Sequence, residues 1–169
     1  MNLPTITLRA LEPEDLDELY AIENDTEIWD VGHTNVPYSR YALHDYIAHA
    51  SADIYADRQV RLMIVSGEGR AVGLVDVVNY DPQHQRAEVG IVVKKPFRNA
   101  GYGHAALQAV VDYARRFWHL HQLYALVDVD NETSLHLFAE MGFTDGGRLK
   151  SWLFDGKNYH DVCLMQTFL

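Results

Sequence analysis

Apolar residues repeat along the chain with strand-like and helix-like periods in turn. The first apolar stretch, residues 6–8, predicts a strand. Pro13 and the acidic residues after it are typical of a helix start, and the next apolar residues share one face, so we expect a helix over residues 13–24. Ser39 is a suitable cap for a second helix, because apolar residues spaced three and four apart follow it.

The middle of the chain predicts three strands and a long helix. Two apolar runs, residues 60–65 and 71–78, are separated by the turn-forming sequence Ser-Gly-Glu-Gly, which indicates an antiparallel hairpin. Residues 87–93 form a third apolar run, which predicts another strand. From Gly103 to about His119, apolar residues repeat at intervals of three and four, the pattern of a strongly amphipathic helix.

The last third of the chain predicts a strand over residues 123–127, a helix over 132–141 and a closing hairpin. Gly142 stands where helices often end in a left-handed residue, and Asp155-Gly156 is a typical two-residue hairpin turn. The complete order predicts an α/β protein, with a mixed sheet of the α+β kind and helices on both faces, in a single domain over residues 1–169.

Composition agrees with one globular domain. The chain has 169 residues, of which 48% are hydrophobic and 22% charged. No apolar run approaches the roughly 20 residues of a membrane span, and the start of the chain lacks the pattern of a secretory signal. We therefore expect a cytoplasmic protein with no membrane partner.

The charge of the chain favours one class of ligand. Asp and Glu number 24 against 14 Lys and Arg, which gives a net charge of −10. Such a charge repels polyanions and attracts cations by long-range electrostatics. It argues against nucleic acid as a partner and in favour of a cationic small molecule.

Residue types exclude several kinds of site. Cys163 is the only cysteine, so the chain has no intrachain disulfide and no thiolate-rich metal site, and its apolar neighbours predict that it packs within a strand. The nine histidines include no H-E-x-x-H motif, and His119 and His121 fall at a helix end and before a strand, so we expect no metal. The absence of G-x-S-x-G argues against Ser-His-Asp catalysis.

The segment 92–103, Val-Val-Lys-Lys-Pro-Phe-Arg-Asn-Ala-Gly-Tyr-Gly, runs from a predicted strand through a loop into a helix. Gly101 and Gly103 allow backbone N–H groups to approach an anion, and a helix start adds its positive dipole end. Arg98 adds a positive charge. The segment therefore predicts a pyrophosphate site, although a plain strand-to-helix turn would use the same two glycines.

Two motifs in this order resemble those of a known family. Arg98-x-x-Gly101-x-Gly103 matches the R/Q-x-x-G-x-G/A acetyl-CoA motif of the GNAT acetyltransferases, and residues 130–143 resemble their N-x-x-[AS]-x-x-[LIV]-[YF]-x-x-x-G-F signature. Over nearly its whole length the chain looks most like the bacterial spermidine and diamine N-acetyltransferases, next to the ribosomal-protein N-terminal acetyltransferases. The resemblance implies a GNAT-type acyl-CoA N-acyltransferase fold with a mostly antiparallel central sheet.

The resemblance also implies a cosubstrate and its contacts. In this family two neighbouring strands splay apart, so that the pantetheine arm of acetyl-CoA binds like an added strand. An N–H near Ile91 would stabilise the oxyanion, Val93 would bind the pantetheine, and Asn131 would bind the cofactor, cap its helix, or do both. The full set of expected cofactor contacts is Ile91, Val92, Val93, Arg98, Asn99, Ala100, Gly101, Tyr102, Gly103, His104, Asn131, Ser134 and Phe138.

Acetyl transfer to an amine requires a base, because only a neutral amine is nucleophilic. Glu88 lies on the strand before the cofactor loop, where the polyamine enzymes carry a corresponding Glu, so we expect it to take the amine proton directly or through a water. The alternative for Glu88 is a solvent-facing position on that strand.

One residue departs from the family pattern. Where the polyamine enzymes carry a Tyr that protonates the departing thiolate, this chain has Phe138, which has no proton to give. Water, Tyr102 or Ser134 would have to protonate the leaving group, or CoA would leave as the thiolate.

The acceptor side is matched less well, above all in the segment 27–38. Glu27, Trp29 and Asp76 are the expected substrate contacts, and Glu23 and Asp30 are further acids for a cation site; solvated surface acids are the alternative. We therefore expect acetylation of a polyamine or diamine such as spermidine. Acetylation of protein N-termini or antibiotics and a non-catalytic acetyl-CoA sensor are the alternatives. Relatives of this kind include higher oligomers, so a homo-oligomer is among the expected states.

Overall fold

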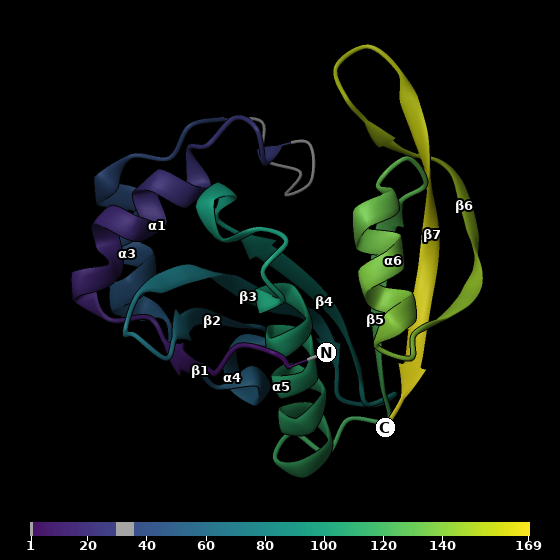
Figure 1. Ribbon diagram of the computed structural model, residues 1–169, viewed down its shortest axis with the longest axis horizontal. Coiled ribbons are helices and arrows are strands. Elements are labelled where there is room, and N and C mark those ends of the chain that lie inside the picture. The colour runs from purple at the N-terminus through teal and green to yellow at the C-terminus, as the bar shows by residue number, and fades with distance from the viewer. Residues whose placement is uncertain (1, 30–35) are drawn as a thin grey trace.

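A computed structural model describes residues 2–29 and 36–169 of the chain, and it contains one seven-stranded mixed sheet (Figure 1). Its elements in chain order are β1 (Ile6–Ala10), a 3-10 turn (Pro13–Asp15), α1 (Leu16–Glu23), α3 (Arg40–His49), α4 (Ile54–Asp57), β2 (Val60–Ser66), β3 (Ala71–Asp81), β4 (Arg86–Val93), a second 3-10 turn (Lys95–Phe97), α5 (Tyr102–Arg116), β5 (Gln122–Asp128), α6 (Glu132–Glu140), β6 (Thr144–Phe154) and β7 (Tyr159–Phe168).

The sheet is mostly antiparallel, as expected. Its strand order is β1-β2-β3-β4-β5-β7-β6, and every neighbouring pair is antiparallel except β4 and β5. The parallel pair requires a crossover, which α5 provides. This topology confirms the predicted fold class.

Helices cover both faces of the sheet, and strand alternation shows why. On β2, Leu62 and Ile64 pack into the core that contains α5 and α6, whereas Met63 between them packs with α1 and α3. Successive side chains of a strand point to opposite faces, so the unbroken apolar run 62–65 needs apolar cover on each side. The expected arrangement with helices on both faces is confirmed.

The parallel pair β4–β5 is joined over only part of its length. Arg86, Ala87 and Glu88 pair with Gln122, Leu123 and Tyr124, and no further pairs follow. Beyond Glu88 and Tyr124 the strands continue to Val93 and Asp128 without pairing with each other. The expected splay is therefore present, and it opens the sheet between α5 and α6.

Local sequence signals correctly predicted the start of α3 and the end of α6. The Ser39 hydroxyl accepts a hydrogen bond from the Ala42 N–H at 3.0 Å, which confirms the cap. Gly142 adopts a left-handed φ of +82° after α6, and Cys163 lies within β7. None of the helices among residues 2–29 and 36–169 is both long and apolar enough to cross a membrane.

Two details differ from the sequence prediction. Helix α5 begins at Tyr102 and ends at Arg116 rather than near His119. His119 is left-handed, with φ +51°, and the Leu120 N–H bonds back to the Ala114 carbonyl, so the chain turns before the last apolar positions. The four-residue helix α4 was not predicted; the Asp53 carboxylate caps it by accepting the Tyr55 N–H at 2.8 Å.

Candidate active site

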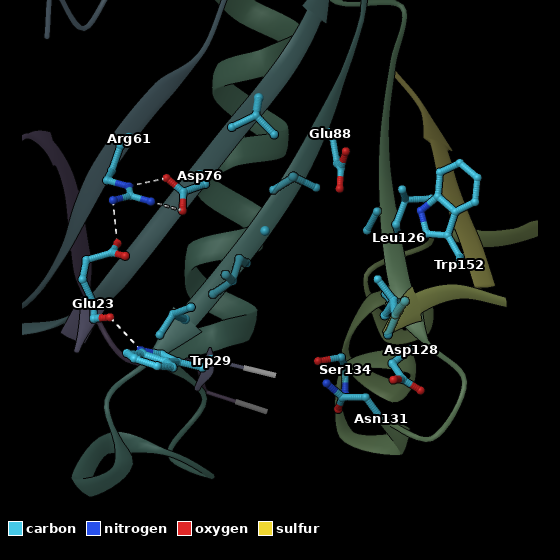
Figure 2. A pocket seen from close by; sticks show the side chains of 18 of the residues that line it. Glu23, Trp29, Arg61, Asp76, Glu88, Leu126, Asp128, Asn131, Ser134 and Trp152 are labelled. Carbon is cyan, nitrogen blue, oxygen red and sulfur yellow. Dashed lines mark hydrogen bonds and ion pairs between the residues drawn. The ribbon is translucent and has the colours of Figure 1, made fainter. Parts of the chain in front are cut away.

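A cleft of about 1560 Å³ lies where β4 and β5 separate. Figure 2 shows two walls with Glu88 between them. We call them the Arg61 wall (Glu23, Trp29, Arg61 and Asp76) and the His160 wall (Asp128, Asp130, Trp152, Asp155 and His160), and all of these residues line the cleft. The two walls lie on opposite sides of the gap between β4 and β5, so the separation of these strands creates the site.

The structure gathers many of the residues expected from the sequence around this cleft. Those that line it are Glu23, Trp29, Asp76, Glu88, Ile91, Val92, Asn131, Ser134 and Phe138. Val93 and residues 98–104 lie outside its lining. Glu27 is also outside it, exposed and paired with the Lys95 ammonium at 3.0 Å. Asp30 lies outside the described residues.

Glu88 projects from β4 into the cleft (Figure 2), on the opposite face from its buried neighbours Ala87 and Val89. One oxygen of its carboxylate, Oε2, accepts a hydrogen bond from the Asn79 amide at 2.9 Å. Tyr124 is its partner on β5. Burial raises the pKa of the Tyr124 phenol, and the nearby Glu88 charge raises it further. The Tyr124 phenol therefore stays neutral beside the Glu88 side chain.

Backbone groups of β4 face the gap at the positions expected to bind the cosubstrate. The Lys94 N–H, just after β4, donates to the Val72 carbonyl on β3 at 2.9 Å. Because backbone groups alternate direction along an antiparallel strand, those of Val93 and Ile91 point away from β3 and toward the gap. One of these backbone groups, the Val93 carbonyl, accepts a hydrogen bond from Nε of the Arg98 guanidinium at 3.0 Å.

The loop before α5 has the features of an anion site. Gly101 caps the helix with a left-handed φ of +83°. The first helical hydrogen bond runs from the Ala105 N–H to the Gly101 carbonyl, so the three N–H groups at 102–104 are not used within the helix. A Cβ at Gly103 would lie 3.3 Å from the Leu137 side chain on α6. The second glycine thus also permits close packing of α5 against α6.

The Arg61 wall holds a compact ion-pair network. The Arg61 guanidinium contacts the Asp76 carboxylate at 2.5 and 3.0 Å and the Glu23 carboxylate at 2.6 Å. Burial raises the pKa of Glu23 even though the Arg61 charge lowers it. Burial also acts to lower the pKa of Arg61, but Asp76 and Glu23 outweigh it and the pKa rises. The two predicted acids therefore face the cleft with their charges partly compensated.

Sequence reasoning missed Arg61, although a signal was present. Arg61 is the single charged residue inside the apolar run 60–65. A charge in such a position requires a partner once the strand is covered on both faces. The Trp29 indole also belongs to this wall, because its Nε1–H donates to the Glu23 carbonyl at 2.9 Å.

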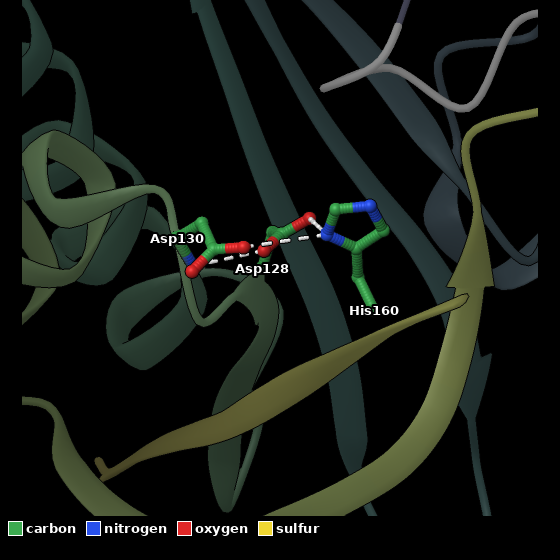
Figure 3. A group of neighbouring side chains, drawn as sticks. All are labelled: Asp128, Asp130 and His160. Atoms are coloured by element: carbon green, nitrogen blue, oxygen red, sulfur yellow. Dashed lines mark hydrogen bonds and ion pairs between the residues drawn. The ribbon is translucent and has the colours of Figure 1, made fainter. Parts of the chain in front are cut away.

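The His160 wall contains a second ionic cluster (Figure 3). His160 Nδ1 lies 3.6 Å from the Asp128 carboxylate and 3.4 Å from that of Asp130, while Nε2 lies 2.8 Å from Asp155. The hydrogen bond that His160 donates to the Asp155 carboxylate raises the pKa of His160. Hydrogen bonds from the Asn158 N–H and from His160 lower the pKa of Asp155 to about 2. This cluster joins the β6–β7 hairpin to the loop before α6.

The same cluster bears on the expectation of no metal. Asp128, Asp130 and His160 each offer a ligand atom, and these atoms lie within 4.8 Å of one another. The second ring nitrogen of His160 is held by Asp155. The histidine spacing in the sequence gave no sign of this group, since its members come from β5, the following loop and β7. The absence of a metal stays a prediction.

The start of α6 supplies the remaining expected residues. Asn131 Oδ1 accepts the Ser134 N–H at 3.1 Å, so Asn131 is the helix cap. Phe138 is 5% exposed and stacks edge-on against Phe143, with 5.0 Å between ring centroids. Tyr102 instead packs edge-on against Phe97, away from the residues that line the cleft. Of the two hydroxyls considered as proton donors, Ser134 is the one that reaches the cleft.

Several known proteins are similar to this chain in sequence and in fold. The profile of the acetyltransferase (GNAT) domain matches residues 5–144. The chain is 27% identical over 168 residues to spermidine N(1)-acetyltransferase of Escherichia coli K12, which covers 97% of this chain and 86% of that protein.

Two solved structures have the same fold. A crystal structure of spermidine N-acetyltransferase from Vibrio cholerae in complex with CoA and spermine superposes with a TM-score of 0.87 at 28% identity, covering 96% of this chain and 95% of that one. A dodecameric structure of the Vibrio cholerae enzyme in an intermediate state gives a TM-score of 0.81 at 28% identity, covering 96% and 93%.

Proposed function

Because the chain belongs to the acetyltransferase (GNAT) family, we propose that it moves the acetyl group of acetyl-CoA to a primary amine of a polyamine or diamine, such as spermidine. Acetyl transfer is the activity of the family. The acceptor is the new element, and it follows from the charge of the cleft.

The observation that carries this proposal is the excess of carboxylates around Glu88. Among the described residues lining the cleft, six are Asp or Glu and only Arg61 carries a fixed positive charge; the acids are Glu23, Asp76, Glu88, Asp128, Asp130 and Asp155. Carboxylates facing a common space attract cations and lower the energy of a multiply charged amine. A neutral or anionic acceptor would gain nothing from this lining. The net charge of −10 acts in the same direction at longer range.

The groups around the start of α5 and along β4 support a binding mode for acetyl-CoA. The unused N–H groups at 102–104 and the charge of Arg98 would bind the pyrophosphate. The gap-facing backbone of Val93 and the Asn131 side chain would hold the pantetheine arm. Acetyl-CoA supplies a thioester, whose carbonyl carbon is open to attack by an amine.

Glu88 would begin the reaction by accepting a proton from the acceptor ammonium, directly or through a water. The neutral nitrogen then bonds to the carbonyl carbon, while the Ile91 N–H, which faces the gap, donates to the developing oxyanion. The carbon–sulfur bond breaks, sulfur leaves as the thiolate, and the nitrogen, now bonded to the acetyl group, loses its second proton to water. Ser134 lines the cleft and would be a candidate to protonate that sulfur, since Phe138 has no proton to give.

The relatives support the same acceptor. The Escherichia coli relative is a spermidine acetyltransferase, and the Vibrio cholerae enzyme was crystallised with spermine. The dodecameric structure of the latter supports a homo-oligomer for this chain as well.

An acceptor screen with labelled acetyl-CoA tests the proposal. Spermidine, spermine, a diamine, a peptide with a free N-terminus and an aminoglycoside should be compared at equal concentration. We expect kcat/KM to be highest for the polyamines and to fall with rising salt, because screening weakens attraction to the acidic cleft. Preferred transfer to the peptide or the antibiotic would contradict the proposal. Binding of CoA without transfer to any amine would indicate the sensor alternative.

A further inference from the structure

Glu88 has one side-chain hydrogen-bond partner among the described residues, and that partner occupies an unusual place in the sheet. The amide Nδ2 of Asn79 on β3 donates to Glu88 Oε2 at 2.9 Å. An ionised carboxylate only accepts hydrogen bonds, so the amide nitrogen, and not its oxygen, must face Glu88. The contact therefore has a defined direction and leaves the second oxygen of Glu88 unused.

Asn79 reaches Glu88 because β3 contains a bulge. The register of β3 against β4 passes from the pair Val78–Glu88 to the pair Asp81–Arg86. Two residues of β3, Asn79 and Tyr80, thus stand opposite Ala87 alone. Bulges of this kind redirect side chains and are frequent beside active sites.

The bulge reverses the faces on which two side chains would otherwise lie. In a regular strand Asn79 would follow Val77 to the buried face, and Tyr80 would follow Val78 toward the cleft. Instead Tyr80 is 8% exposed and packs in the core with Val77, while Asn79 is exposed and contacts Glu88. One inserted residue therefore fills the core and brings an amide donor to Glu88.

The backbone of Asn79 explains why asparagine suits this position. Its φ is +54°, in the left-handed region that most side chains avoid. Asn and Gly adopt this conformation most readily, but only Asn among these two adds a hydrogen-bond donor. Strained backbone next to a reactive group is a recurrent feature of functional sites.

We propose that Asn79 is the positioning residue of the catalytic base: its amide holds one oxygen of Glu88 so that the other faces the acceptor amine. The inference rests on the proposed function, in which Glu88 accepts the ammonium proton. The proton passes to the free oxygen, and the amide keeps its hydrogen bond before and after the transfer. The donor also stabilises the ionised carboxylate, as hydrogen bonds to a charged form do.

Besides the acids of the two cleft walls, the titratable groups beside Glu88 in the described part of the chain include Tyr124, Asp81 and Arg86. Tyr124 lies beside it on β5 with a pKa raised by burial. Asp81 and Arg86 form an ion pair at 3.2 Å at the far end of the bulge. These groups stay fixed in the variants below, so a changed pH profile would report on the contact between Asn79 and Glu88.

The test compares Asn79→Gly and Asn79→Asp with the parent enzyme, using the best amine acceptor. Glycine keeps the left-handed backbone and removes the donor. We expect kcat/KM for the acceptor to fall about tenfold, with the affinity for CoA unchanged. The apparent pKa of the acid limb of the pH profile should rise from parent to Asn79→Gly and further to Asn79→Asp, whose carboxylate repels that of Glu88.

Two controls separate positioning from a structural role. Gln85→Gly alters another left-handed residue, with φ +51°, whose side chain makes no hydrogen bond to Glu88, and its activity should match the parent. In a Glu88→Gln background, Asn79→Gly should cause no additional loss. An unchanged acid limb in both Asn79 variants, or a loss of CoA affinity equal to the loss of rate, would overturn the inference. A parent enzyme that acetylates no amine would instead overturn the proposed function.

Discussion

Glu88 on β4 and Tyr124 on β5 form the last pair before the two parallel strands separate. On the N-terminal side of this pair β4 and β5 are hydrogen-bonded to each other, and apolar side chains of the sheet are buried under α5. On the C-terminal side the facing edges of the two strands are unpaired, and the cleft begins there. In the proposed reaction, the position of Glu88 at this branch point would place a carboxylate where an acceptor amine meets the acyl group between the strands.

Substitution of Glu88 by Gln should lower kcat by about a hundredfold or more, because general bases contribute roughly this much. The amide keeps the size of the side chain, and Glu88 is not among the residues expected to hold CoA. Steady-state kinetics and calorimetric titration with CoA would measure the two effects. Glu68→Gln, on the exposed β2–β3 turn, is the control. Unchanged turnover at all pH values would remove Glu88 from the mechanism.

Substitution of Arg98 by Ala should weaken CoA binding about tenfold, the effect of losing one charge-assisted hydrogen bond. This variant is preferable to Gly101→Val, because Gly101 has a φ of +83° and its Cβ would lie 3.0 Å from Pro4, so valine there would disturb the fold. Calorimetry with CoA provides the measurement. Arg115→Ala, exposed at the other end of α5, should bind like the parent. Equal affinity in both variants would place the pyrophosphate elsewhere.

The sequence predicted those parts of the fold that local signals determine. The β2–β3 turn follows from Ser-Gly-Glu-Gly, and the start of α3 follows from Ser39, because a few neighbouring residues suffice for each. The end of α5 was predicted wrongly from the sequence. Its apolar pattern continues through Trp118, but the left-handed residue His119 and the return of the chain to β5 end the helix earlier.

The two walls of the cleft could not be predicted from spacing. Glu23, Arg61 and Asp76 meet from α1, β2 and β3, and His160 meets Asp128 across the β5–β7 pair. Such clusters depend on strand order and register, which no short segment of sequence encodes. The cofactor loop and Glu88 could be proposed from the sequence because they lie on one contiguous stretch, a strand followed by a loop with a family motif, and their roles stay predictions.

Removal of the Arg61 charge should destabilise the protein. Arg61→Ala leaves Glu23 and Asp76 without a cation, and the three side chains are 12–29% exposed. We expect a loss of about 2 kcal/mol in the free energy of unfolding, below the 3–5 kcal/mol typical of fully buried pairs. Urea denaturation would measure it.

The β2–β3 hairpin provides a matched control for Arg61. Arg70 faces Glu68 at 3.4 Å, with both side chains more than 60% exposed. Arg70→Ala should therefore cost less than about 0.5 kcal/mol, as expected of an exposed pair. Equal losses in the two variants would show that the Arg61 network has no special role in stability.

The His160 cluster should make stability depend on pH. The pKa of His160 is raised in the folded protein, mainly by its hydrogen bond to Asp155. Its stabilising effect is therefore complete below the ordinary histidine pKa of about 6.5 and is lost as the pH rises through the raised value. Asp155, with a pKa of about 2, stays ionised throughout. The melting temperature of His160→Gln should lie below that of the parent at pH 5.5 and approach it at pH 9.

His44 on α3 is the control for this pH effect, because it is exposed and has no ion pair among the described residues. His44→Gln should melt like the parent at both pH values. A difference between the parent and His160→Gln that is the same at pH 5.5 and pH 9 would contradict the assigned ion pairs.

Phe138 stands where the resemblance in sequence implies a Tyr, and Phe138→Tyr tests the fate of the leaving group. The ring lines the cleft but is 5% exposed and packed against Phe143, so an added hydroxyl must find both space and a partner. A general acid contributes about a hundredfold when its use limits the rate. We expect kcat to rise at most about threefold, because water or Ser134 already serves and the thiolate can leave unprotonated. Kinetics with a slowly reacting amine, compared with Phe143→Tyr as control, would measure the gain. A large increase confined to Phe138→Tyr would show that protonation of sulfur limits the natural enzyme. Activity that appears only in that variant would mean that the parent binds acetyl-CoA without using it.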